Sequence, residues 1–220
     1  MIKAAYRALG DLTSPDFRSI LWKAIGLSLL MFVGLFVAVQ AAFWFLTFFP
    51  YPWVETLAAI GAGLGLLVAF FFLMAPVTAV FAGLYLDSVA AKVEKRHYPH
   101  EPEGKALSTF RALRISVQFG LLVLLVNILA LPLVLTGFGA IVLVVINAYL
   151  LSREYFEMAA MRFMEPQDAK DFRKENGAAV FVAGFIPAVM SLVPIVNLTV
   201  PLFSTSYFVH LFKQAKRSSV

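Results

Sequence analysis

The residues best suited to bind an anion lie near the start of the chain, in the run Thr13-Ser14-Pro15-Asp16-Phe17-Arg18-Ser19. Ser14 is a good N-cap, and Pro15 suits the first position of a helix. A helix that begins here presents backbone N–H groups and the positive end of its dipole, and Arg18 can add a bidentate contact. Asp16 opposes an anion, so a capped interfacial helix whose arginine contacts lipid phosphate is the competing interpretation.

A second cationic pair, Arg111 and Arg114, stands at the entrance to a long apolar stretch. Residues three apart share one face of a helix, so both guanidinium groups point to the same side. They could form the positive mouth of an anion path. The alternative is that both arginines anchor a membrane helix at the lipid headgroups.

Residues suited to hydrolytic, redox or metal chemistry do not form a recognisable set. The chain has no cysteine, and it contains neither a nucleophile elbow nor a His-Glu-x-x-His helix. His97 and His100 lie near two glutamates, but Pro99 and Pro102 break any helix that would align them. The sequence therefore predicts no enzyme, no catalytic residue, no metal site and no cofactor.

The elements that must position these residues are four stretches free of Asp, Glu, Lys and Arg: 24–54, 56–86, 115–152 and 176–212. Each exceeds the roughly 20 residues that a helix needs to cross a bilayer. The composition agrees, because 14% of the residues are charged, against about 25% in soluble domains. We predict an all-α integral membrane protein, with residues 1–220 as a single membrane domain.

The stretches differ in continuity. Segments 24–49 and 55–86 are predicted to be full crossings, whereas 115–152 and 176–212 contain helix breakers. These are Pro132, Gly137 and Gly139 in the first, and Pro194, Asn197 and Pro201 in the second. One half of 115–152, of roughly 13 residues, spans only about 20 Å and is too short for a core about 30 Å thick. We predict helical hairpins that re-enter on the side they left or, if the helices extend into the charged flanks, cross tightly twice.

This arrangement puts both termini and the predicted helical segments 87–114 and 153–175 on one face. That face holds all 18 Lys and Arg residues, which the positive-inside rule assigns to the cytoplasm. Because these residues flank membrane segments, lipid headgroups account for the net charge of +5, and we exclude nucleic acid as a partner. Uncharged polar residues inside the apolar stretches, such as Asn127 and Asn147, are expected to bond between helices.

Two short motifs accompany the hairpins: Arg153-Glu154-Tyr155-Phe156-Glu157, and a Pro-aliphatic-aliphatic-Asn-Leu run closed by a second proline within 191–201. With two crossings and two hairpins, they resemble the CysZ-type sulfate permeases of bacteria. The resemblance implies a homo-oligomer of the inner membrane that takes up sulfate for cysteine synthesis and needs no cofactor.

The resemblance also implies an oxyanion site at an early Pro-x-aliphatic-Arg segment. Here that segment falls on Pro15, Phe17 and Arg18, next to Ser19, with Phe17 standing where an aliphatic residue is usual. We expect a passive sulfate permease that captures an anion there and leads it past Arg111 and Arg114. Its partners would be sulfate or a similar oxyanion, membrane lipids and further copies of the chain. The alternative is a membrane-embedded scaffold or lipid-interacting protein that transports nothing.

Overall fold

The computed structural model describes residues 1–46, 52–134 and 138–218, and these residues form ten helices and no strand. In chain order the helices are Ile2–Leu12 (α1), Pro15–Leu46 (α2), Pro52–His97 (α3), Thr109–Val134 (α4), Gly139–Met161 (α5), Pro166–Glu175 (α6), Gly177–Ala183 (α7), Phe185–Met190 (α8), Pro194–Asn197 (α9) and Val200–Ser218 (α10). The predicted all-α fold class is therefore confirmed for these residues.

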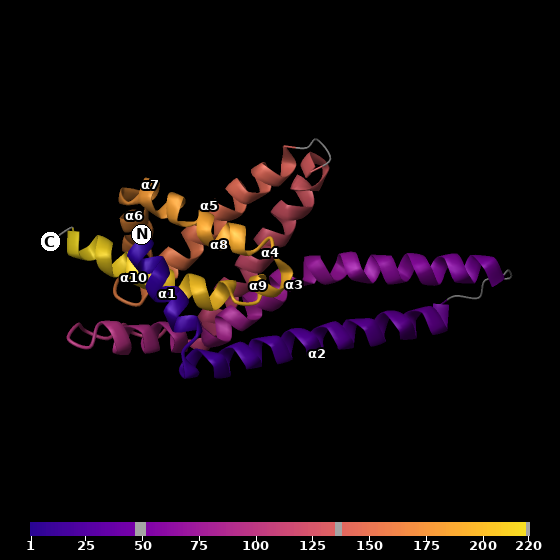
Figure 1. Cartoon of the computed structure of the whole chain (residues 1–220), viewed down its shortest axis with the longest axis horizontal. Helices are drawn as coiled ribbons and strands as arrows, with labels where there is room; N and C mark the ends of the chain where they lie inside the picture. Colours follow the sequence, from indigo (N-terminus) through magenta and orange to yellow (C-terminus); the bar gives the residue numbers. More distant parts are fainter. Residues whose placement is uncertain (47–51, 135–137, 219–220) are drawn as a thin grey trace.

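Helix α2 and the first half of α3 form a long arm that extends away from the rest of the molecule (Figure 1). Residues 47–51, between α2 and α3, lie outside the described residues. Large apolar side chains on this arm face outward, among them Leu30, Phe36, Leu57 and Ile60. An exposed apolar face of this kind is typical of a surface that contacts lipid or another chain.

By length and composition, the described helix able to cross a membrane is Phe110–Ala130 within α4, with a mean hydropathy of 2.0. The crossings at 24–49 and 55–86 therefore stay predictions.

The first hairpin consists of α4 and α5. Pro132 lies inside α4, Gly139 begins α5, and Gly137 lies outside the described residues. The helices have 26 and 23 residues because both extend into the charged flanks, so each is about 35–39 Å long. Asn127 and Asn147 exchange side-chain hydrogen bonds of 3.3 Å between them, which confirms their predicted role. The double crossing and the re-entrant form of this hairpin both stay predictions.

The second hairpin is more broken. Pro194 begins α9, Asn197 ends it, and Pro201 lies in the first turn of α10. The entering arm, Gly177–Met190, is apolar but shorter than a crossing needs. It packs so closely on α5 that a Cβ on Gly184 would lie 2.0 Å from the Ala148 carbonyl oxygen. The re-entrant form of this hairpin stays a prediction.

Helix α10 is the centre of the core. It contacts α1, α3 and α5, and Phe203, Phe208 and Phe212 on it are fully buried (Figure 1). Lys213 is also buried, with its Nζ 4.1 Å from the centre of the Phe163 ring. The apolar stretch 176–212 thus supplies the interior of the region where α1, α3 and α5 pack on α10. We call this region the polar end, because it also holds the buried ion pairs described next.

A buried ion-pair network holds this end together. Arg162, 4% exposed, donates from Nε to Glu94 Oε1 (2.9 Å) and from Nη1 to Asp87 Oδ1 (2.5 Å), and Glu94 is 2% exposed. Glu94 also accepts the backbone N–H of Gly104 at 2.9 Å. A Cβ on Gly104 would lie 2.8 Å from Arg162 Cβ, so only glycine fits here. The network fastens the segment between α3 and α4 to the end of α5.

Candidate functional site

A cavity of about 420 Å³ lies at the end of the α4–α5 hairpin opposite its turn. It is formed by the first turns of α4, the last turns of α5 and the start of α6. The lining residues that carry polar groups are Arg111, Arg114, Gln118, Arg153, Glu154, Glu157 and Lys170. The volume lies in the range typical of small-molecule sites, about 300–1,000 Å³.

The antiparallel hairpin explains why these residues meet. Arg111 and Arg114 lie near the beginning of α4, and Arg153 and Glu157 lie near the end of α5, so the two helices bring them to the same level. Spacings of three and four residues keep each pair on one helix face. Lys170, one helix later, closes the ring from α6.

The charges around the cavity are unbalanced, with four cationic side chains against two acidic ones. Glu157 accepts a 2.7 Å bond from Arg173 Nε and lies 3.7 Å from Arg153 Nε, four residues before it on the same helix. Arg111, Arg114 and Lys170 are exposed and have no carboxylate within 4.0 Å among the described residues. These three cations are therefore available to a ligand.

Glu154 is the unusual acid of the cavity. Its side chain is half-buried, and its Oε1 is shielded without a hydrogen-bond partner in the described part of the chain. Burial, and secondly the charge of Glu157, raise the pKa of Glu154 to about 7. Around neutral pH this carboxyl group is partly protonated, which leaves the cavity more positive than its formal charges suggest.

Such an arrangement can bind an oxyanion reversibly. Exposed guanidinium groups offer bidentate hydrogen bonds to tetrahedral oxyanions, and a lysine adds a point charge. Since the cations face solvent instead of being locked in pairs, an anion can enter and leave without breaking the fold.

The predicted site at the start of α2 has a different environment. Arg18 and Ser19 are exposed, as is Pro15, but Phe17 is 2% exposed and belongs to the core. The backbone N–H groups of Phe17 and Arg18 both donate to the Ser14 carbonyl at 3.1 Å. These groups, which we expected to be available to an anion, already have a partner. An anion here would depend mainly on the Arg18 side chain.

The described residues around the cavity do not include any of this N-terminal segment or of the hairpin breaks. Of the predicted residues, the structure brings Arg111 and Arg114 together and leaves Arg18 elsewhere. It adds Arg153, Glu154 and Lys170, which the sequence analysis did not assign to a site. One feature of the sequence could have singled out Glu154: no basic residue lies three or four positions away, where it could pair with this glutamate on one face of a helix.

Comparison with known proteins agrees with the residue pattern. A family model described as sulfate transporter CysZ/etoposide-induced protein 2.4 matches residues 4–201, which is most of the chain. Comparison with curated proteins gives no match. The match spans α1 to the beginning of α10 and so includes the whole cavity. The chain belongs to the sulfate transporter CysZ/etoposide-induced protein 2.4 family.

Proposed function

We propose that this protein is a sulfate permease of the bacterial inner membrane, which takes up sulfate passively and supplies cysteine biosynthesis. The observation that carries the proposal is the cavity at the end of the α4–α5 hairpin, with three cations that have no carboxylate partner among the described residues. The family description, which names a sulfate transporter, supplies the oxyanion.

In this proposal the Arg111/Arg114 cavity is the main binding step and Arg18 is a separate contact for the anion, both on the cytoplasmic side. Arg18 is exposed at the beginning of α2, where the helix dipole adds to its attraction for an anion. Arg111 and Arg114, one helical turn apart, can hold a tetrahedral oxyanion between them, with Lys170 opposite.

A passive mechanism fits the distribution of acids. The four apolar stretches contain no Asp or Glu, which are the residues that proton-coupled transporters use inside the membrane. Sulfate would then follow its own gradient, with both termini on the cytoplasmic side.

Assembly of several copies is part of the proposal. Leu57, Ile60 and Leu64 on α3 are exposed, and a Cβ added to Gly61 would meet nothing within 4 Å. This face is free to pack against a second copy or against lipid. A homo-oligomer would also shield the broken backbone of the second hairpin.

The test is charge reversal in the cavity. The purified Arg111→Glu/Arg114→Glu variant, reconstituted into liposomes, should take up radiolabelled sulfate at least about tenfold more slowly than the wild type. A matched double reversal on exposed lysines away from the cavity, Lys3→Glu/Lys95→Glu, should keep most of the uptake. The uptake of an Arg18→Glu variant measures the contribution of Arg18 separately.

Equal loss in the cavity variant and the lysine variant would reject the cavity as the binding step. Uptake no faster than in empty liposomes, for the wild type and all three variants and from protein that is inserted and folded, would favour a role as a membrane scaffold.

A further inference from the structure

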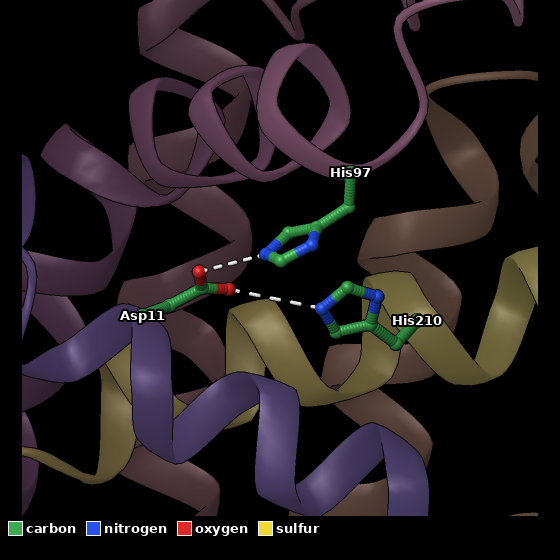
Figure 2. A group of neighbouring side chains, drawn as sticks. All are labelled: Asp11, His97 and His210. Carbon is green, nitrogen blue, oxygen red and sulfur yellow. Dashed lines mark hydrogen bonds and ion pairs between the residues drawn. The ribbon is translucent and has the colours of Figure 1, made fainter.

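A second polar cluster lies in the polar end and shares no residue with the lining of the cavity. Figure 2 shows its three side chains. Asp11 comes from the last turn of α1, His97 is the last residue of α3, and His210 lies in the middle of α10. Asp11 is 1% exposed and His210 is 0% exposed, while the His97 side chain is partly open to solvent. One ligand atom from each residue lies within 4.8 Å of the other two.

The separations of these atoms suit a common metal ion. His97 Nε2 lies 2.9 Å from Asp11 Oδ1, and His210 Nε2 lies 3.7 Å from Asp11 Oδ2. Two ligands bound tetrahedrally to zinc, each about 2.0–2.1 Å from the ion, are about 3.3 Å apart. The two observed distances lie on both sides of this value but end on different oxygens of Asp11, so the carboxylate must turn for one ion to be shared by all three residues.

His210 provides an independent sign of a missing ligand. Its Nδ1 forms a 2.8 Å hydrogen bond with the Tyr98 hydroxyl, but its buried Nε2 has no hydrogen-bond partner among the described residues. Buried polar atoms are almost always satisfied, so this one needs an explanation. When Nδ1–H donates to Tyr98 Oη, the Nε2 lone pair points toward Asp11, as a metal ligand requires.

The surroundings of Asp11 prepare a charged carboxylate. His97 Nε2 and Ser206 Oγ each hydrogen-bond to one oxygen of this buried carboxylate. Ser206 Oγ donates to Asp11 Oδ2 at 2.6 Å and so fixes the orientation of the carboxylate.

Two arginines oppose a cation at this cluster. Arg96 Nη1 lies 3.6 Å from Asp11 Oδ1. The positive charge of Arg7 also acts electrostatically on His210. The Arg96 side chain is half-exposed, so it can turn into solvent when a cation arrives.

We propose that Asp11, His97 and His210 bind one divalent transition-metal ion of the zinc class. Two imidazole nitrogens and one carboxylate oxygen are ligands that such ions favour, and the fourth position is left to a solvent molecule. On binding, His97 changes tautomer: its proton moves from Nε2 to Nδ1, which leaves the Nε2 lone pair for the metal. The ion would link α1, α3 and α10. Its ligand Asp11 lies four residues before the beginning of α2.

The test uses full-length protein with a tag that contains no histidine, treated with chelator and then titrated with Co²⁺ and Zn²⁺. The absorption of Co²⁺ and the zinc content should both reach about one equivalent per chain. Asp11→Asn and His97→Gln should each lower the affinity at least about tenfold. His100→Gln, which alters the exposed third histidine, should leave both readings unchanged.

Tyr98→Phe separates positioning from folding. It removes only the hydroxyl that orients His210, so we expect the Co²⁺ spectrum to change and the affinity to fall about tenfold while the helical content is retained. If Asp11→Asn does not fold, His97→Gln decides, because its side chain is partly open to solvent. Wild-type protein that retains no Co²⁺ or Zn²⁺, or a His100→Gln variant that loses as much affinity as His97→Gln, would overturn the proposal.

Discussion

The polar end around α10 and the cavity on the α4–α5 hairpin both contain several charged side chains. The two regions differ in how far these charges are exposed to solvent and in whether they have partners. In the polar end, Glu94 and Arg162 are buried against each other, and Asp11 is enclosed by histidines and Ser206. In the cavity, Arg111, Arg114 and Lys170 face solvent without carboxylate partners among the described residues.

This difference assigns the two regions different roles. A buried charge that loses its partner destabilises the fold strongly, so the polar end depends on its pairs for stability. An exposed charge contributes little to folding, so the cations of the cavity can serve a ligand instead. Substitutions in the two regions should therefore separate stability from transport.

The largest expected effect comes from Arg162→Met. The variant leaves Glu94 buried without its cation, which should cost about 3–5 kcal/mol of unfolding free energy and lower Tm by at least about 6 °C. Arg114→Met, on the exposed rim, should cost less than about 0.5 kcal/mol but slow sulfate uptake. Thermal unfolding in detergent and liposome uptake measure both quantities. A similar loss of Tm in the two variants would remove the distinction between the regions.

Glu154→Gln sharpens the comparison through pH. Burial raises the pKa of Glu154 from 4.5 to about 7, so the folded state holds this proton more tightly than the unfolded state does. Wild-type stability should therefore fall as pH rises from about 4.5 to 7, by about 2–3 kcal/mol, and stay lower above that range. The glutamine variant should be more stable than the wild type at pH 8 and equal to it near pH 4.5.

The same substitution should alter transport. Wild-type uptake should be faster at pH 6 than at pH 8, because the ionised carboxylate repels an anion, and Glu154→Gln should reduce this difference. A variant that retains the full pH dependence of both stability and uptake would show that another group is responsible.

The smallest expected effect concerns the two partners of Glu157. Arg173→Met removes a 2.7 Å bond to a nearly buried carboxylate and should cost about 1–2 kcal/mol, whereas Arg153→Met removes a contact of 3.7 Å and should cost less than about 0.5 kcal/mol. Thermal unfolding of the two variants in parallel gives the comparison. The reverse order would mean that Arg153 is the main structural partner.

The helices and the pair of arginines could be predicted because both depend on local sequence. Long stretches without charge predict helices, and the spacing of Arg111 and Arg114 predicts a shared face whatever the rest of the fold does. The exact break in the first hairpin was less predictable. Pro132 is accommodated within α4, since its missing N–H and ring affect only one turn, and the helix ends at Val134.

The polar end could not be predicted, because its contacts join distant positions. His97 and Asp11 are 86 residues apart, and Tyr98 and His210 are 112 apart. From the sequence, the candidate ligands near His97 are its neighbours in a proline-rich turn. The prolines prevent these neighbours from lining up on a helix, so the sequence does not predict a metal site there. Asp11 carried no warning either, since a carboxylate near the end of a short helix is usually exposed.

The most direct test of the central claim is radiolabelled sulfate uptake into liposomes that hold the purified wild-type protein, with and without excess selenate or chloride. We predict uptake that saturates with sulfate and is blocked by selenate but not by chloride. Uptake no faster than in empty liposomes, from protein shown to be folded, would contradict the account.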